Sequence, residues 1–252
     1  MGRLRLTTLV PLLLLLGAFA IYVGVAVGTG QTQYLTVDNL LTILGRSIAL
    51  GITAVGQTFA ILVASIDLSV ANLISVAAVL ASFVMDGDPA MMLPATLLVL
   101  AVGALVGLTN GLVITKLGVN PLIATLGMAL VLQGLLSASF NNFAGAVPEA
   151  FQGFAYGTVG GLPVSLLFLL GLTVAAWAFL RFTRAGSNFY SVGGNAEAAK
   201  LAGIATDRVR ILAHVICSVC AAIAGLYLAS RLRSGAPWIG RDGVYDLESI
   251  AV

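Results

Sequence analysis

Residues 91–114 read MMLPATLLVLAVGALVGLTNGLVI, a stretch of 24 residues without a charged side chain. An α-helix needs about 20 predominantly apolar residues to cross the hydrocarbon core of a bilayer. A membrane β-strand would instead show alternating apolar and polar residues, and this stretch does not alternate. The stretch therefore predicts a transmembrane α-helix.

The composition of the whole chain supports an integral membrane protein. Of its 252 residues, 60% are hydrophobic and 9% are charged, whereas a soluble domain carries about 25% charged residues. Twelve Lys and Arg with ten Asp and Glu are too few to cover a water-exposed surface of this size. This argues against a soluble enzyme, a nucleic-acid-binding protein and a disordered chain. Two cysteines give no disulfide framework.

Similar apolar runs recur along the chain and predict an all-α polytopic fold with about seven transmembrane helices. The runs are Leu9–Val27, Leu40–Val63, Val70–Met85, Met91–Ile114, Pro121–Phe140, Val164–Leu180 and Ile211–Ala229. The third and sixth are short, so we expect them to be less tilted or packed inside the bundle. The first resembles a signal peptide, with a small-residue site at Ala18–Ala20. However, it continues to Val27 without a polar region, which favours a span.

The distribution of Lys and Arg predicts a cytoplasmic N-terminus, because short cytoplasmic segments are enriched in these residues. With that orientation, three outside loops around residues 28–39, 86–90 and 141–163 contain neither residue type. The inside segments contain Arg3, Arg5, Lys116, Arg181, Arg184, Lys200, Arg208 and Arg210. The C-terminal tail is an exception, with Arg231, Arg233 and Arg241 outside. Its Pro237, Gly240 and Gly243 indicate an irregular or re-entrant segment.

The longest cytoplasmic connection, residues 181–210, contains the signature of a short capped helix. Asn195 is a good N-cap, Glu197 suits the first turn, and Gly203 suits the position after the last turn. A helix of two turns is unstable alone and needs a surface to pack against. The segment is therefore either a connector lying on its own bundle or a docking element for a cytoplasmic partner.

Few polar residues lie in or beside the runs. Asp67 precedes the third run, where an ionisable residue is a functional candidate, although we favour a role as a helix cap. Buried amides and hydroxyls either join helices or line a hydrophilic path; we take as candidates for such a path Gln57, Thr58, Asn110, Asn120 and Thr125. Small residues at a spacing of four predict close helix packing in the fourth run, at Gly103, Gly107 and Gly111.

Catalytic and metal-binding chemistry is not indicated. His214 is the single histidine, which leaves no histidine cluster for a metal, and we expect it at the membrane interface. Cys217 and Cys220 have a CxxC spacing, but they lie mid-helix, in lipid, outside the fold context of redox proteins. The phosphate-binding motif GxxxxGK[ST] is missing, so we do not expect the chain itself to bind ATP.

Four ordered segments resemble the permeases of ribose-type ABC transporters. The segment from Gly56 to Val70 is similar to their "GxTFVIL…GIDLSVG" stretch, with Ser65 and Ala71 in place of glycines. Residues 107–111 and 120–127 are similar to "GxxNG…PFIxTLG". Residues 193–204 are similar to "GGNxxAAxxSGI", and residues 245–251 to "YELDAIA".

The resemblance implies the membrane subunit of a bacterial inner-membrane importer for a monosaccharide, forming one permease domain over residues 1–252. It implies a homodimer or heterodimer of permeases, a cytoplasmic ATPase that uses ATP-Mg, and a periplasmic sugar-binding protein. In the family, the loop with glycine and asparagine is the helix that couples to the ATPase. The implied coupling residues are Gly194, Asn195, Glu197, Ala198, Ala199 and Gly203.

Two further expectations accompany the resemblance. Family members continue beyond the position of Val252 with more membrane helices, so we expect the chain to be truncated at its C-terminus.

The alternative function is ion-coupled secondary transport of a small polar solute, which usually needs carboxylates within the membrane. Apart from Asp67, the seven runs contain neither Asp nor Glu. A channel would need a filter loop or charged rings, and neither is visible.

Overall fold

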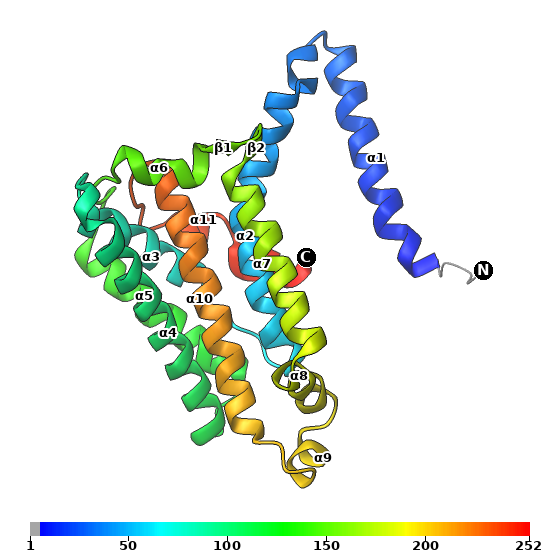
Figure 1. The fold of residues 1–252 in the computed structure, drawn as a ribbon, viewed down its shortest axis with the longest axis vertical. Helices are drawn as coiled ribbons and strands as arrows, with labels where there is room; N and C mark the ends of the chain where they lie inside the picture. Colours follow the sequence, from blue (N-terminus) through cyan, green and yellow to red (C-terminus); the bar gives the residue numbers. More distant parts are fainter. Residues whose placement is uncertain (1–5) are drawn as a thin grey trace. The chain divides into compact units, whose positions relative to one another are not determined.

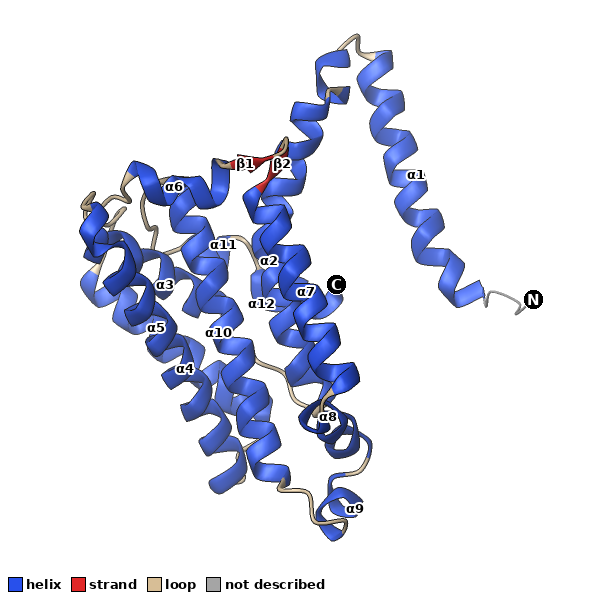
Figure 2. Cartoon of the chain, in the orientation of Figure 1, coloured by secondary structure: helices blue, strands red, loops and turns tan. Residues whose placement is uncertain are grey.

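The computed structural model describes residues 6–252 and is helical through most of that range (Figures 1 and 2). The described residues divide into two compact units, 6–46 and 47–252. The first contains α1 (Leu6–Gly28), the short 3-10 helix η1 (Thr32–Leu35) and the beginning of α2 (Val37–Leu62). Here the Asn39 side chain donates to the Tyr34 carbonyl at 2.8 Å, which closes the turn between the helices.

The second unit contains the rest of α2 and the remaining elements. These are α3 (Val70–Met85), η2 (Pro89–Met91), α4 (Met92–Lys116), α5 (Pro121–Ser139), α6 (Glu149–Tyr156), β1 (Thr158–Val159), β2 (Leu162–Pro163), α7 (Val164–Phe182), α8 (Arg184–Gly194), α9 (Ala196–Leu201), α10 (Thr206–Leu232), α11 (Ile239–Asp242) and α12 (Tyr245–Ala251). The all-α prediction is thereby confirmed, and each of the seven predicted runs coincides with a helix.

The described helices differ in how well they qualify as membrane spans. Five are long and apolar enough to cross a membrane: Asn39–Leu62, Pro89–Lys116, Pro121–Ser139, Val164–Phe182 and Thr206–Leu232. Val70–Met85 is shorter, and most of its residues are buried, as expected for a short helix inside the bundle. For the sixth run, packing inside the bundle is wrong, because only 6% of the apolar core of α7 is buried, and a smaller tilt stays a prediction.

Helix α10 is the centre of the second unit, and 67% of its most apolar window is buried. It packs most extensively on α4 and α3. Glycines line these contacts: a Cβ atom at Gly111 of α4 would lie 2.7 Å from the Cα of Ile211, and one at Gly225 would lie 2.5 Å from the Cβ of Ala77. The helix backbones can approach this closely because glycine has no side chain, which confirms the packing role predicted for Gly103, Gly107 and Gly111.

The loop at residues 141–163, which is predicted to lie outside, is more ordered than the sequence indicates. It contains α6 and the β1–β2 hairpin. Ser230, near the end of α10, donates from its hydroxyl to the carbonyl of Phe151 at 2.9 Å and accepts from the amide of Ala155 at 3.1 Å. Tyr156 donates to the carbonyl of Arg231 at 2.7 Å. These bonds hold α6 over the end of α10.

The chain re-enters the bundle after α10, as the C-terminal pattern predicts. It reverses at Arg233, whose φ of +63° lies in the left-handed region, and then descends along α3. Gly235 lies against Val79 and Ser82, and the Gly240 amide donates to the Ser75 hydroxyl at 2.9 Å. The contacts run from Ser82 back to Ala71, about 16 Å at 1.5 Å per helical residue. We call residues 234–252 the re-entrant segment.

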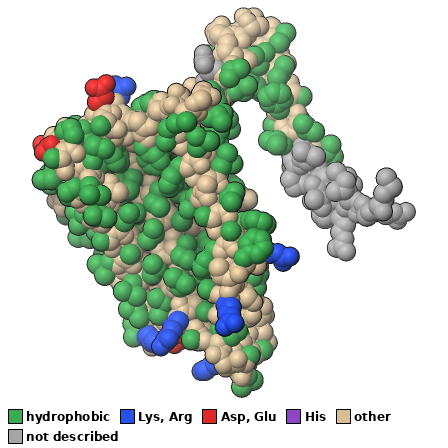
Figure 3. Space-filling view, in the orientation of Figure 1, with side chains coloured by type: hydrophobic (Ala, Val, Ile, Leu, Met, Phe, Trp, Pro, Cys, Tyr) green, Lys and Arg blue, Asp and Glu red, His purple; other side chains and the backbone are tan. Residues whose placement is uncertain are grey.

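The predicted orientation can be tested with two exposed positions. Figure 3 shows several Lys and Arg side chains gathered at the end of the bundle where α8 and α9 lie. With Cys217 and Cys220 replaced by alanine, a cysteine at Ser187 should resist an impermeant thiol reagent in intact cells. A cysteine at Ala150 should react, because the outside of the membrane is accessible. Labelling at Ser187 but not at Ala150 would reverse the topology.

Candidate functional site

The chain is interrupted between α2 and α3, and Asp67 organises this interruption. Ala64 has a φ of +56°, a left-handed conformation that is unfavourable for a non-glycine residue. One Asp67 carboxylate oxygen accepts from the backbone amide of Ser69 at 2.9 Å and from its hydroxyl at 2.6 Å. The N-cap of α3 is Ser69. The favoured interpretation of Asp67 as the helix cap is therefore wrong, because it lies two residues earlier and closes the turn instead.

The second carboxylate oxygen of Asp67 faces His214 of α10, with 3.1 Å between Oδ2 and Nδ1. The other ring nitrogen of His214 lies 2.8 Å from the Ser65 hydroxyl. Both His214 and Asp67 are fully buried. The prediction of an interfacial histidine is therefore wrong. Its partner is 147 residues away in sequence, and a helical pattern alone does not reveal that contact.

Asn110 of α4 and Thr125 of α5 complete a buried cluster around the interruption. The Asn110 amide donates to Asp67 Oδ2 at 3.3 Å and to the Ser69 hydroxyl at 3.0 Å. Thr125 accepts from the amide of Leu68 at 3.1 Å. A buried carboxylate is tolerated when it is paired and hydrogen-bonded. We refer to Ser65, Asp67, Ser69, Asn110, Thr125 and His214 as the Asp67 cluster.

The chain of hydroxyl, imidazole and carboxylate in this cluster has the same order as in serine hydrolases. In those enzymes the hydroxyl faces a substrate. Here Ser65 retains only 5% of its surface, and the imidazole and carboxylate behind it retain none. The arrangement therefore joins the α2–α3 interruption to α10 and offers a fixed connection between helices.

The five candidates for a hydrophilic path fall into two groups. Gln57 is buried against α10, where the Cys217 thiol donates to its oxygen at 3.2 Å, and Asn110 and Thr125 are buried in the Asp67 cluster. Thr58 and Asn120 are exposed, and Asn120 caps α5 by accepting from the amide of Leu122 at 2.9 Å. A role in translocation stays a prediction for all five.

The two cysteines lie inside the helix bundle, whereas the sequence had predicted that they face lipid. Cys217 and Cys220 are buried free thiols, and a Cβ atom at Gly56 of α2 would lie 2.6 Å from the Cβ of Cys220. They are therefore part of the α2–α10 contact. Within residues 6–252, no group of three His, Cys, Asp or Glu side chains is placed to hold a metal.

The connection at residues 181–210, which the sequence predicts to be cytoplasmic, folds into two helices, of which the sequence indicates only the second. The predicted N-cap of α9 is confirmed, since Asn195 accepts from the amide of Ala198 at 2.9 Å. At the other end Gly203 has a φ of +85°. The Gly203 amide donates to the backbone carbonyl of Lys200, and the Ile204 amide donates to the backbone carbonyl of Ala199, both at 3.0 Å. These are the two bonds of a Schellman motif.

Helix α8 precedes α9 and fixes its position. Phe189 of α8 is fully buried and makes an edge contact with Phe59 of α2, with ring centroids 5.5 Å apart. At Gly193 a Cβ atom would collide with the carbonyl of Leu62, so α8 meets the end of α2 directly. Its amphipathic pattern is short and glycine-rich, which explains why the sequence does not indicate it.

The two faces of α9 have different surroundings. Ala199 is buried and packs in a cluster with Val209 and Ala213 of α10. Glu197 and Ala198 are exposed, and Leu201 retains 91% of its surface. Ala199 was expected on an exposed docking face and is buried instead, so its role in coupling stays a prediction, and the exposed Leu201 was not predicted. The sequence signal that could have identified Leu201 is a large apolar residue within a connection that is otherwise rich in charged and small residues.

Together, these features define a polytopic α-helical membrane protein with an interrupted helix pair, a re-entrant segment and an ordered connection at one end. Residues 39–245 match the family described as "Branched-chain amino acid transport system / permease component". The chain belongs to this family, and it is a ribose-type permease of the ABC transporter class in the bacterial inner membrane.

Several relatives show the same relationship over most of the chain. The ribose import permease protein of Escherichia coli strain K12 is 34% identical over 230 residues, covering 89% of this chain and 71% of the relative. The D-allose transport system permease protein of the same organism is 30% identical, covering 88% and 68%. The autoinducer 2 import system permease protein of Photorhabdus luminescens is 31% identical, covering 84% and 66%. No solved structure matches the chain.

Proposed function

We propose that this chain is the membrane subunit of an ABC importer for a monosaccharide, driven by ATP-Mg hydrolysis in a separate cytoplasmic ATPase. The observation that carries the proposal is α9, a helix capped at both ends that presents Leu201 outward at 91% exposure. A cap and a packed inner face make the helix rigid, and its free apolar side chain suits a groove on a partner. The permease names of the relatives, for ribose and D-allose, support a sugar as the solute.

The remaining partners follow from the same proposal. A second permease, identical or related, would complete the pathway across the membrane, and a periplasmic binding protein would deliver the sugar. Helix α9 would transmit the movement of the ATPase through Ala199, which contacts the first turns of α10. Because α10 is the centre of the bundle, its displacement would alter the contacts with α3 and α4 together.

Ion-coupled transport is the alternative that the sequence leaves open. It needs an intramembrane carboxylate able to exchange an ion. Asp67 is already hydrogen-bonded to Ser69 and Asn110 and faces His214. Uptake in proteoliposomes distinguishes the two mechanisms. ATP inside the vesicles should drive uptake without an ion gradient, whereas uptake that needs a proton or sodium gradient instead would favour the alternative.

Docking of the ATPase is tested by a charge at the exposed leucine. Leu201→Glu should reduce recovery of the ATPase in pull-downs by more than about tenfold, since the loss of an interface anchor commonly costs about 2 kcal/mol. Ala198→Glu should act in the same direction. Leu117→Glu is the matched control, because Leu117 is also an exposed leucine, at 73%, beyond the end of α4. Equal recovery of the ATPase with Leu201→Glu and with the control would show that α9 only connects α8 to α10.

The N-cap allows a milder test of the same helix. Asn195→Ala removes the bond to the amide of Ala198 and should destabilise α9 by about 1 kcal/mol. We expect ATP hydrolysis to become less dependent on the sugar-loaded binding protein, while insertion in the membrane stays normal. Asn195→Ser retains a capping oxygen and should restore coupling. Unchanged coupling in Asn195→Ala would show that helix order is unimportant.

A further inference from the structure

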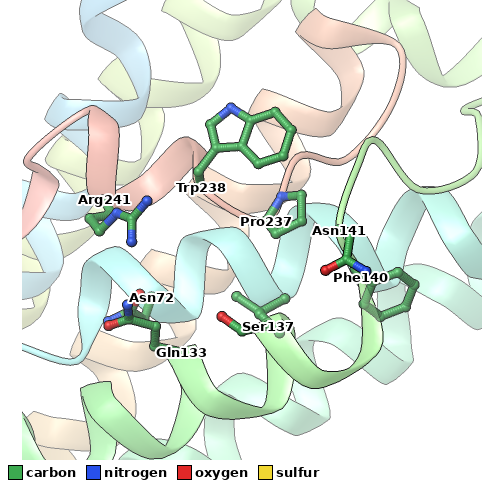
Figure 4. A pocket seen from close by; sticks show the side chains of 9 residues that line it. Asn72, Gln133, Ser137, Phe140, Asn141, Pro237, Trp238 and Arg241 are labelled. Atoms are coloured by element: carbon green, nitrogen blue, oxygen red, sulfur yellow. The ribbon is translucent and has the colours of Figure 1, made fainter.

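A polar hollow lies between the re-entrant segment and two helices of the bundle. It is lined by Asn72 of α3, by Gln133, Leu136 and Ser137 of α5, by Phe140 and Asn141 just beyond α5, and by Pro237, Trp238 and Arg241. Its volume is about 210 Å³. Figure 4 shows Trp238 on the opposite side of the hollow from Ser137, with its indole ring extending away from that residue, and the Arg241 side chain directed toward Asn72 and Gln133.

The polar side chains around this hollow have unused hydrogen-bonding groups. Within the described part of the chain, none of the amides of Asn72, Gln133 and Asn141 has a hydrogen-bond partner, and neither does the Ser137 hydroxyl. An amide offers two donors and an acceptor that accepts twice. Three amides and a hydroxyl around one small space therefore suit a solute that both donates and accepts many hydrogen bonds, as a polyol does.

The remaining lining residues narrow the class of solute. Trp238 and Phe140 supply aromatic surface, and the Trp238 ring is held by an edge contact with Phe143, with centroids 5.5 Å apart. An aromatic face covers the C–H surface of a sugar ring while the amides meet its hydroxyls. Arg241 is the one charged residue in the lining, and its guanidinium lies 3.7 Å from the Asp242 carboxylate. No carboxylate lines the hollow to hold a cation.

The backbone around the hollow is also of the kind that forms transport sites. Irregular backbone at membrane depth is tolerated where it is buried in protein or lines a water-filled cavity. Discontinuous helices form the substrate sites of many transporters. The segment that carries Pro237, Trp238 and Arg241 is interrupted in this way, and Gly240 fixes it against Ala71 and Ser75 of α3.

We propose that this hollow binds one neutral sugar ring during import, with Trp238 and Phe140 at the edge of the ring and Asn72, Gln133 and Asn141 on its hydroxyls. This inference rests on the proposed function and adds the binding site and its chemistry. A volume of about 210 Å³ lies below the range of pockets for drug-sized ligands, about 300–1,000 Å³. The size of the hollow therefore suits a single ring better than a disaccharide.

Direct binding can be measured without transport, because the chain has only two tryptophans. In the full-length Trp177→Phe variant in detergent, Trp238 is the single tryptophan. Titration with D-ribose and D-allose should shift its emission in a saturable way, and lactose should not. The Trp238→Phe variant, which keeps only Trp177, is the matched control and should not respond. Equal behaviour of the two variants with all three sugars would overturn the proposal.

Transport by the complex with its ATPase and binding protein gives the second readout. Trp238→Ala and Gln133→Leu should each lower the uptake of D-ribose or D-allose by about tenfold, as the loss of one good contact does. Recovery of the ATPase in pull-downs should not change. Trp238→Phe should retain most of the uptake, and Trp177→Ala, on the exposed face of α7, should retain all of it.

The outcomes separate this inference from the proposed function. If the wild-type complex takes up neither sugar, the proposed function fails for these solutes, and the fluorescence titration still decides whether the hollow binds them. If the wild-type complex imports a sugar and the variants at Trp238 and Gln133 import it equally well, the hollow is not a sugar site.

Discussion

Replacing Gly107 with leucine is expected to destabilise the folded protein strongly. A Cβ atom at this position would lie 2.6 Å from the Cα of Val215, and it would also collide with the carbonyl of His214. The obstacle is the backbone of α10, which cannot rotate away like a side chain. Overpacking in a well-packed interior costs about 1–3 kcal/mol and sometimes more. This contact lies at the centre of the bundle, so we expect the upper end of the range.

The measurement is the yield of monodisperse protein in detergent together with the apparent unfolding temperature. Gly127→Leu on α5 is the matched control, because nothing lies within 4 Å of a Cβ atom built there. Both changes place the same side chain in a membrane helix, and only the first meets a neighbouring backbone. A stable, monodisperse Gly107→Leu variant would mean that α4 and α10 do not approach as described.

Replacing Asp67 with alanine should also destabilise the fold strongly. The change removes the acceptor for Ser69 and Asn110 and the partner of His214. Leaving one member of a buried pair without its partner commonly costs about 3–5 kcal/mol. Thermal unfolding in detergent measures the effect. The double variant Asp67→Leu, His214→Leu should lose less than the sum of the two single losses, because the paired groups are coupled.

An exposed ion pair provides the contrast. Lys116 and Asp207 join the ends of α4 and α10 at 2.6 Å, and their side chains are 58% and 45% exposed. Exposed pairs contribute about 0–1 kcal/mol, so Lys116→Ala should change the unfolding temperature little. If Asp67→Ala is no more harmful than Lys116→Ala, the Asp67 cluster does not fix the α2–α3 interruption.

Local patterns predicted much of this fold because the membrane imposes a strong rule on length and polarity. The bounds of α3 match the third apolar run, Val70–Met85. The cap at Asn195 and the glycine at Gly203 were also predictable, since each acts within one helix turn. Such features need no knowledge of distant residues.

Features that depend on distant contacts were not predictable from one sequence. His214 looked interfacial because only its position in α10 was visible, whereas its burial depends on Asp67 and Ser65. Ala199 and Ala198 are adjacent alanines with similar sequence surroundings, yet packing on α10 buries only the first. The polar hollow joins residues from α3, α5 and the re-entrant segment, which no local period connects.

The Asp67 cluster has a consequence for synthesis of the protein on the ribosome. Asp67 is made 43 residues before Asn110 and 147 residues before His214. At about 5–20 residues per second, the wait for His214 lasts about 7–30 s. During this interval the carboxyl must stay hydrated or take up a proton, because a bare charge in lipid is costly. The nascent α2–α3 pair is therefore expected to remain with the insertion machinery until α10 arrives and completes the bundle.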